Sequence, residues 1–473
     1  MSDRPIIPLG RWDLPTRARH LGLWRRLTGP QLLVGSFAIL VLLGTLGFKW
    51  LPGLYTGPEL TWRQALFTST SAVCVTGLIV VDTATYFTFW GQAYILLLIQ
   101  LGGLGIITFA SLLIVALGRR LSLRQEAISR EAADVAPAVK PILLLRDVVI
   151  FTFAIELAGA LLLYVQWVSE FGWTGAIWPA VFHSVSAFCN AGFSTFTYSL
   201  VPYQRAPGIQ LVVMLLIILG GIGFLTMEEL RLRWQAGRKK RIFRLSLHSR
   251  LVLIITALLI LGGWIIFAFL EWSISLKDLP PWARLLNALF MSVTARTAGF
   301  NTVDYAQMSD SGNFFTVLLM MIGGSPGSTA GGIKTTTFAL IFLLAWSRFR
   351  RHEITSVAGR SVPEETIQRA IGLTVTAFGL VTGAILALPI AESPDGRAGG
   401  RFLAYMFEAT SAFNTVGLSM GVTAAISAPG QLILVALMFL GRVGPLALAA
   451  ALARREPTMA GEFRYAYEDV VVG

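Results

Sequence analysis

The chain has 473 residues, of which 55% are hydrophobic and only 14% are charged, and its mean hydropathy is +0.68. This composition excludes an ordinary soluble globular protein and indicates an integral membrane protein. The formal net charge of +12 would suggest a nucleic-acid partner only if it formed a basic face on a soluble module, and the sequence shows no such module.

The placement of the basic residues predicts the orientation in the membrane. Of the 38 Lys and Arg residues, 28 lie in the terminal segments or at one set of ends of the apolar runs, and 7 lie at the opposite ends. The positive-inside rule places the richer set in the cytoplasm. We therefore expect a multi-pass protein of the plasma (inner) membrane with both termini cytoplasmic. The basic start has no apolar core or cleavage site, so no removable signal peptide is expected.

The first 118 residues predict a tail followed by one structural unit. Residues 1–30 are polar and basic, as in a cytoplasmic tail or an interfacial helix. Residues 31–51 are long enough for a helix to cross the bilayer. Residues 56–73 begin with polar groups and suit a half-length helix that enters from outside, and residues 90–117 return to the cytoplasm. The unit is therefore a helix, a re-entrant loop and a second helix.

The rest of the chain repeats this plan. We expect an all-α membrane protein with four such membrane-pore-membrane repeats in pseudo-fourfold arrangement round one pore, giving eight full spans and four re-entrant loops. The predicted repeats are 31–118, 141–234, 250–347 and 366–453, with a cytoplasmic tail at 454–473. Within the later repeats the predicted segments are 142–168, 177–191 and 208–234, then 251–272, 282–298 and 314–346, then 367–390, 402–416 and 431–452.

A short motif recurs after each half-length helix. It reads S-A-V-C-V-T-G-L, S-A-F-C-N-A-G-F, V-T-A-R-T-A-G-F and S-A-F-N-T-V-G-L, and its glycines are Gly77, Gly192, Gly299 and Gly417. Non-helical backbone at membrane depth must line a watery cavity or be buried in protein. Glycine permits the positive φ that such a turn needs, and carbonyls facing one axis could replace a cation's water shell. The alternative is that these are small residues that pack helices together.

A second motif lies farther along each repeat, as L-G-G-L-G, L-G-G-I-G, I-G-G-S-P-G and L-G-R-V-G. It is expected near the middle of each second helix, where a glycine costs about 1 kcal/mol relative to alanine. In the third repeat, S-P-G-S-T-A-G-G-I-K (residues 325–334) interrupts the apolar run. We interpret it as a broken-helix gate; a passive kink is the alternative, and a nucleotide-binding P-loop fits the spacing poorly.

The fourth repeat carries Arg442 where the others have glycine. A lone arginine at this depth costs about 2.5–3.5 kcal/mol on insertion scales, so it should find carbonyls or polar groups near the cavity. Its charge would repel cations, which favours a role as gate or barrier over a structural pair. Arg296 is expected to brace the carbonyls of the third loop, and His183 to be a satisfied packing residue. Cys74 and Cys189 are interpreted as small buried residues.

Two other classes of protein compete with an ion pathway. A membrane-embedded enzyme, such as a lipid-modifying transferase, would need clustered catalytic groups, but Glu156, Glu408 and the pair Glu228 and Glu229 share no spacing with a nucleophile or metal ligand. A secondary transporter with inverted repeats conflicts with repeats that all run in the same direction.

The loops V-T-G-L, N-A-G-F, T-A-G-F-N-T and N-T-V-G-L, together with G-G-S-P-G-S-T-A-G-G-I-K-T-T-T and L-G-R-V-G-P, resemble the Trk/Ktr/HKT superfamily of potassium transporters. Within it the sequence looks most like the KtrB subunits of bacterial Ktr systems, from about residue 31 to the end. The tail Y-A-Y-E-D-V-V-V-G resembles the KtrB tail that ends at the dimer interface. The resemblance implies potassium conduction, often with sodium dependence, and a homodimer on a cytoplasmic ring of RCK-type KtrA subunits that bind ATP or ADP. No organic cofactor and no nucleic acid are expected on this chain.

The resemblance also implies site residues. The gate loop would comprise Gly324, Ser325, Pro326, Gly327, Ser328, Thr329, Ala330, Gly331, Gly332 and Lys334, with Arg442 as gating arginine. In the family, serine at the place of Gly77 goes with sodium permeation, so glycine favours potassium; Ala330 stands where glycine is common. The potassium filter would comprise Val75, Thr76, Gly77, Asn190, Ala191, Gly192, Thr297, Ala298, Gly299, Thr415, Val416 and Gly417.

Overall fold

The computed structural model describes residues 28–105, 141–238, 244–352, 355–357, 360–393 and 399–452. The predicted tail at 454–473 and all but the last residues of the tail at 1–30 lie outside the described residues. The same holds for residues 106–117 at the predicted end of the first repeat.

The first group of helices follows the predicted order. α1 (Gly29–Trp50) begins with a capping box, in which the Gln31 amide N–H donates to the Thr28 side chain and the Thr28 N–H donates to the Gln31 side chain. These bonds satisfy amides that a helix start leaves without acceptors. The short, mostly buried α2 (Trp62–Val73) has the same box at Thr61. After α3 (Thr83–Tyr86), a further helix spans Phe89–Gly105.

The other three groups have the same sequence of a long helix, a short buried helix and a returning helix. Two-residue strands β1 (Ser356–Val357) and β2 (Arg360–Ser361) pair antiparallel between the third and fourth groups. The remaining elements are α5 (Pro141–Gly175), α6 (Ile177–Phe188), η2 (Val201–Tyr203), α7 (Pro207–Ile222), α8 (Phe224–Arg238), α9 (Leu247–Glu271), α10 (Pro281–Thr294), η3 (Tyr305–Gln307), α11 (Asp310–Met320), α12 (Thr335–Phe349), α13 (Glu364–Glu392), α14 (Phe402–Phe413), η4 (Thr423–Ala425), α15 (Ala428–Val443) and α16 (Pro445–Leu452).

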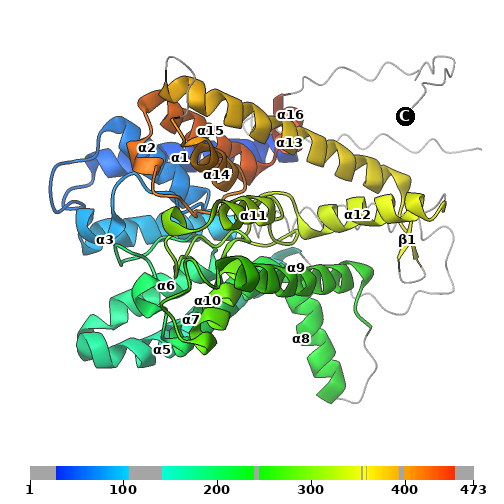
Figure 1. Ribbon diagram of the computed structural model, residues 1–473, viewed down its shortest axis with the longest axis horizontal. Helices are drawn as coiled ribbons and strands as arrows, with labels where there is room; N and C mark the ends of the chain where they lie inside the picture. The colour runs from blue at the N-terminus through cyan, green and yellow to red at the C-terminus, as the bar shows by residue number, and fades with distance from the viewer. Residues whose placement is uncertain are drawn as a thin grey trace, which may run out of the picture.

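In the second and fourth groups the returning segment, predicted as one helix at 208–234 and at 431–452, is divided into two helices. α7 and α8 meet at Gly223 with a bend of 102°, which Figure 1 shows as α8 turning away from the bundle. α15 ends at Gly444, and Pro445 begins α16. Both glycines have positive φ, 90° and 88°, which a residue with a Cβ adopts at a cost. In the second and fourth repeats the last glycine of the second motif therefore ends a helix.

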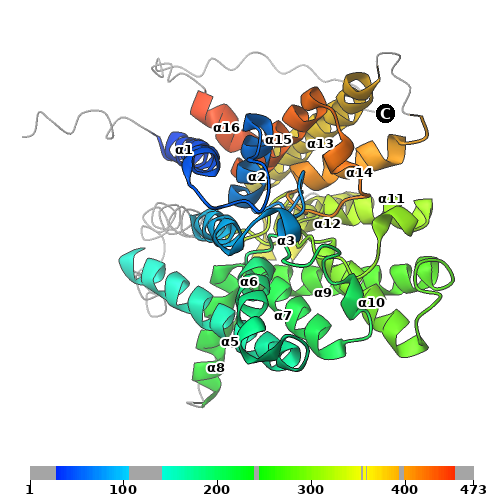
Figure 2. The same cartoon turned by 90° about the vertical axis from the view of Figure 1, so that its left-hand side faces the viewer.

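Figure 2 shows the four groups arranged about a common centre, with α1 and α2 in one quarter, α5 to α7 in the next, then α9 to α11, and α13 to α15 completing the circuit. Separate apolar clusters hold α2 to α15, α7 to α10 and α11 to α14. The all-α prediction is confirmed for the fold as a whole. In the described residues, four helices are long and apolar enough to cross a membrane, and the bent α7 and α8 pair would make five; eight spans remain a prediction.

Candidate functional site

Each short helix leads into a loop with the same backbone turn. One non-glycine residue in each loop has positive φ: Val75 at 55°, Asn190 at 58°, Thr297 at 68° and Thr415 at 49°. Two residues later comes a motif glycine, also at positive φ. A non-glycine residue in this region costs about 1–3 kcal/mol and persists only where the surroundings impose it, typically at functional sites. The same strain in all four loops indicates that this loop conformation is part of a functional site.

The four motif glycines form a closed ring. A Cβ added to Gly192 would lie 2.9 Å from the Ala298 carbonyl oxygen, and one added to Gly299 would lie 2.6 Å from that of Val416. A Cβ on Gly417 would collide with the Thr76 carbonyl oxygen, and one on Gly77 with that of Ala191. Each glycine therefore faces a carbonyl of the next loop, in the order of the four repeats and back to the first. The loops surround one point, as the sequence predicts.

Side chains at the ends of the short helices hold these loops. The amide N–H groups of Gly77 and Gly417 donate to the Ser71 and Ser411 hydroxyls, both at 3.1 Å. In the other two loops the hydroxyls donate instead, Ser186 Oγ to the Phe193 carbonyl at 2.8 Å and Thr294 Oγ1 to the Phe300 carbonyl at 2.5 Å. All four hydroxyl residues are fully buried. The serine or threonine of each motif thus fixes the backbone around its glycine.

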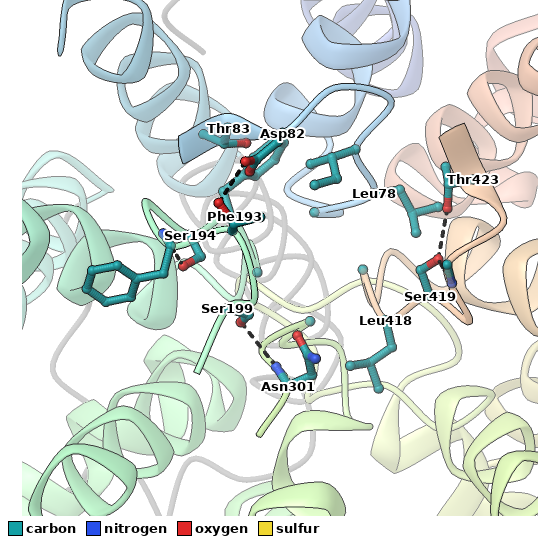
Figure 3. Close-up of a pocket in the computed structure, with 18 of the residues that line it drawn as sticks. Leu78, Asp82, Thr83, Phe193, Ser194, Ser199, Asn301, Leu418, Ser419 and Thr423 are labelled. Carbon is teal, nitrogen blue, oxygen red and sulfur yellow. Dashed lines mark hydrogen bonds between the residues drawn. The ribbon is translucent and has the colours of Figure 1, made fainter. Parts of the chain in front are cut away.

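An outer cavity of about 330 Å³ opens above the ring. Figure 3 shows residues from all four loops on its four sides: Leu78 and Asp82 from the first, Ser194 from the second, Asn301 from the third, and Ser419 from the fourth. Its lining includes the carboxylates of Asp82 and Asp304, and no Lys or Arg among the residues that the structure describes there. A water-accessible entrance of negative charge favours cations.

Two side chains of the short helices, His183 of α6 and Glu408 of α14, reach the chain that follows the ring. The Nε2 of His183 lies 2.9 Å from Ser194 Oγ, and its Nδ1 lies 2.8 Å from the Pro179 carbonyl. Glu408 is fully buried and accepts hydrogen bonds from Ser419 Oγ at 2.5 Å, Thr423 Oγ1 at 2.7 Å and the Met420 N–H at 3.2 Å. His183 is a satisfied packing residue, as expected. For Glu408 the sequence suggested only a possible acidic group of a membrane-embedded enzyme, and its hydrogen bonds to this segment were not predicted.

The equivalence of these two residues could have been found in the sequence. Each lies three residues before the motif serine, Ser186 or Ser411, and each binds the serine two residues after the motif glycine. The expected brace by Arg296 is not found. Among described residues its guanidinium bonds only the Thr256 hydroxyl, at 3.5 Å, and not the carbonyls of the third loop.

Residues 321–334 cross the space below the ring between α11 and α12. The Gly323 N–H donates to the Ile333 carbonyl at 2.9 Å, which closes the base of the loop. The N–H groups of Ser325 and Thr329 donate to the carbonyls of Gly221 and Gly220 at 2.9 and 3.2 Å. Those carbonyls belong to the last turn of α7. The carbonyls in the last turn of a helix have no N–H donor within the helix. Because α7 ends at Gly223, its last carbonyls are free to accept hydrogen bonds from this loop.

Arg442 ties the same loop to the first and fourth repeats. Its side chain is 4% exposed. One terminal nitrogen donates to the Thr329 carbonyl and the other to the Gly102 carbonyl, the latter at 3.3 Å. The Lys334 ammonium donates to the Ala330 carbonyl at 2.6 Å. Arg442 thus finds backbone carbonyls, as its depth requires, and the loop contacts elements of all four repeats.

Comparison with known proteins agrees with this geometry. The family model described as TrkH, cation transport protein, matches residues 31–459. The potassium/sodium uptake protein NtpJ of Enterococcus hirae is 36% identical over 451 residues, 95% of this chain and 98% of the relative. The Ktr system potassium uptake protein B of Bacillus subtilis is 37% identical over 452 residues, 95% and 98%, and that of Vibrio alginolyticus is 37% identical over 446 residues, 94% and 95%.

The fold has a solved counterpart. The crystal structure of the potassium transporter TrkH from Vibrio parahaemolyticus matches with a TM-score of 0.71, covering 92% of this chain and 87% of that chain at 19% sequence identity. A helical membrane fold with carbonyl-lined loops around one centre defines a membrane transport protein. The chain belongs to the TrkH cation transport family, with Ktr system proteins among its relatives. The predicted family is confirmed, as is a transporter in place of an enzyme.

Proposed function

We propose that this chain conducts potassium inward across the plasma membrane, as the ion-conducting subunit of a Ktr-type system. The closed ring of Gly77, Gly192, Gly299 and Gly417 carries the proposal, because it brings main-chain carbonyls of four loops to one axis. Carbonyl oxygens at such a site replace the water shell of a dehydrated cation. The uptake of potassium by the named relatives supports the choice of ion. The filter comprises the residue at positive φ in each loop and the two that follow it.

The ring predicts the outcome of Gly77→Ser. A Cβ at this position, at φ +94°, collides with the Ala191 carbonyl oxygen, so neighbouring oxygens must move. We expect the ratio of potassium to sodium flux to fall about tenfold, which equals about 1.4 kcal/mol of lost discrimination. The measurement is uptake of rubidium and of sodium into proteoliposomes. An unchanged ratio in a correctly folded variant would contradict the filter assignment.

We further propose that the loop from Gly324 to Lys334 and Arg442 form the gate. The loop fills the space below the ring, and Arg442 holds it through the Thr329 carbonyl while placing a positive charge near the path. Opening requires the loop to leave its bonds to Gly220 and Gly221 and Arg442 to release Thr329. A short loop held by a few hydrogen bonds can switch between two arrangements when a regulator favours one.

Arg442→Ala tests this gate. Without the guanidinium the Thr329 carbonyl loses its donor and the path loses a repelling charge, so we expect basal rubidium flux without any partner subunit to rise at least fivefold. Arg442→Lys keeps the charge but offers a single ammonium in place of the two-pronged contact. Its basal rubidium flux should lie between those of the wild type and Arg442→Ala. Unchanged flux in both variants would exclude Arg442 as a gate element.

Assembly is part of the proposal. The Ktr system names of the relatives support assembly with other subunits, and the charge bias supports cytoplasmic termini. The proposed assembly is a homodimer on a ring of nucleotide-binding RCK subunits. We propose that ATP or ADP on that ring controls the gate and that uptake depends on sodium. Rubidium uptake with and without co-expressed cytoplasmic subunit, and with and without external sodium, tests both points. Uptake that changes with neither the cytoplasmic subunit nor external sodium would contradict both proposals.

A further inference from the structure

A second cavity, of about 380 Å³, lies beside the gate loop between α12, α13, α15 and α16. We name it the Lys334–Arg442 cavity after the two cationic residues in its wall. It is separate from the outer cavity, since the two share no lining residue. Most of its other lining is apolar, contributed by Leu373, Ala377, Phe413, Val443, Pro445 and Ala447.

The positive charge of this cavity has no acidic partner among described residues. Neither Lys334 nor Arg442 takes part in an ion pair there. Within the part of the chain that the structure describes, the Lys334 ammonium donates only to the Ala330 carbonyl, and the buried Nε of Arg442 has no acceptor. A buried polar group without an acceptor costs about 1–3 kcal/mol, and more when charged. The wall therefore contains two cationic side chains without an acidic partner among described residues.

The start of α12 adds a third source of positive charge. Lys334 is its N-cap residue and makes no side-chain cap bond, and the first helical bond runs from the Phe338 N–H to the Lys334 carbonyl. Among described residues, the N–H groups of Thr336 and Thr337 find no acceptor. The exposed amides and the dipole at a helix N-terminus favour an anion. Thr337 and Lys334 both line the cavity.

We propose that the Lys334–Arg442 cavity binds a free fatty acid, with its carboxylate between Lys334, Arg442 and the start of α12 and its acyl chain along the apolar wall. A carboxylate accepts from a guanidinium in two-pronged fashion, and the apolar lining excludes a small inorganic anion as the best occupant. The volume lies at the small end of ligand sites, which favours one acyl chain over the two of a phospholipid.

Occupancy would act on the gate, and this step alone rests on the proposed function. Hydrogen bonds between charged partners are roughly twice as strong as those between neutral groups. A carboxylate would therefore compete with the Thr329 and Gly102 carbonyls for Arg442. Arg442 would release the gate loop, so the fatty acid should raise ion flux.

Binding is tested first, on the purified full chain in detergent with radiolabelled oleate. Lys334→Gln removes one cation, and Ala377→Phe fills the cavity from α13. Each should weaken binding at least tenfold. Val375→Phe is the matched control, because Val375 lies on the same helix with its side chain 65% exposed, and it should leave binding unchanged. Equal binding by all four proteins overturns the site.

Competition identifies the chemistry. Oleyl alcohol has the same chain without the charge and should displace oleate at least tenfold less well. Phosphatidylglycerol carries an anionic headgroup on two chains and should also compete poorly. Equal displacement by the alcohol would overturn the role of the two cations, and stronger displacement by phosphatidylglycerol would overturn the single-chain occupant.

Flux is tested separately in proteoliposomes. Oleate should raise rubidium flux at least threefold in the wild type and leave Ala377→Phe unaffected, each compared with its own flux without oleate. An equal rise in both would assign the effect to the bilayer and overturn the coupling. Absence of potassium, rubidium and sodium flux in every protein, with oleate binding intact, would instead contradict the proposed function.

Discussion

Gly299→Ala is expected to reduce rubidium uptake by at least tenfold and to lower the ratio of potassium to sodium flux. Gly299 has φ +81°, and a Cβ there would lie 2.6 Å from the Val416 carbonyl oxygen, 3.0 Å from Gly192 Cα and 3.2 Å from Gly417 Cα. All three atoms are backbone, so no side-chain rotation relieves the contact. The loops of the second and fourth repeats must move, and with them the oxygens that replace water around the ion.

The matched control is Gly379→Ala in α13. The chemical change is the same, but a Cβ at Gly379 meets no atom within 4 Å and the residue lies inside a helix, where alanine is favoured. Uptake by this variant should equal the wild type. Yield and gel-filtration profile separate lost conduction from lost folding. Normal uptake and selectivity by a folded Gly299→Ala protein would refute the ring as the conduction site.

Glu408→Ala is expected to lower ion selectivity, because one buried carboxyl group orders the segment that follows the fourth loop. Its removal leaves the Met420 N–H without its acceptor. The Ser419 hydroxyl then keeps only its contacts with Thr423 Oγ1 at 3.1 Å and with the Gly421 N–H at 2.9 Å. A hydrogen bond contributes about 0.5–1.5 kcal/mol, and a buried donor left without an acceptor costs about 1–3 kcal/mol. We expect at least a fivefold fall in the ratio of rubidium to sodium uptake.

Two further variants, Glu408→Gln and Ser419→Ala, should have smaller effects on the uptake ratio than Glu408→Ala. Glutamine preserves the shape and one acceptor oxygen, so its uptake ratio should lie between those of the wild type and Glu408→Ala. Ser419→Ala removes a single donor and should have a smaller effect than Glu408→Ala. The three proteins are compared by the concentration dependence of rubidium and sodium uptake. A uniform fall in both rates at constant ratio would indicate a purely structural role for Glu408.

Features with a local chemical cause could be predicted from the amino-acid sequence. Apolar runs must be helical in a bilayer, since lipid offers no partner to backbone groups. A turn at positive φ needs glycine wherever a Cβ would collide, so the four loops were visible as Gly77 and its three counterparts. The interruption at residues 325–334 could also be predicted, because Pro326 and its neighbouring glycines disfavour a continuous helix.

Other features depend on contacts between segments that are distant in the chain. Glycines 223 and 444 end helices because the chain beyond them packs elsewhere, whereas a glycine inside an apolar run predicts only a modest cost. Positive φ at Val75, Asn190, Thr297 and Thr415 is imposed by neighbouring loops and has no signature in residue type. The partners of Arg442 and Glu408 come from distant segments. The repeated motif predicts that the four repeats close around one axis, but the partner of each side chain depends on the exact packing of remote segments, which no local pattern records.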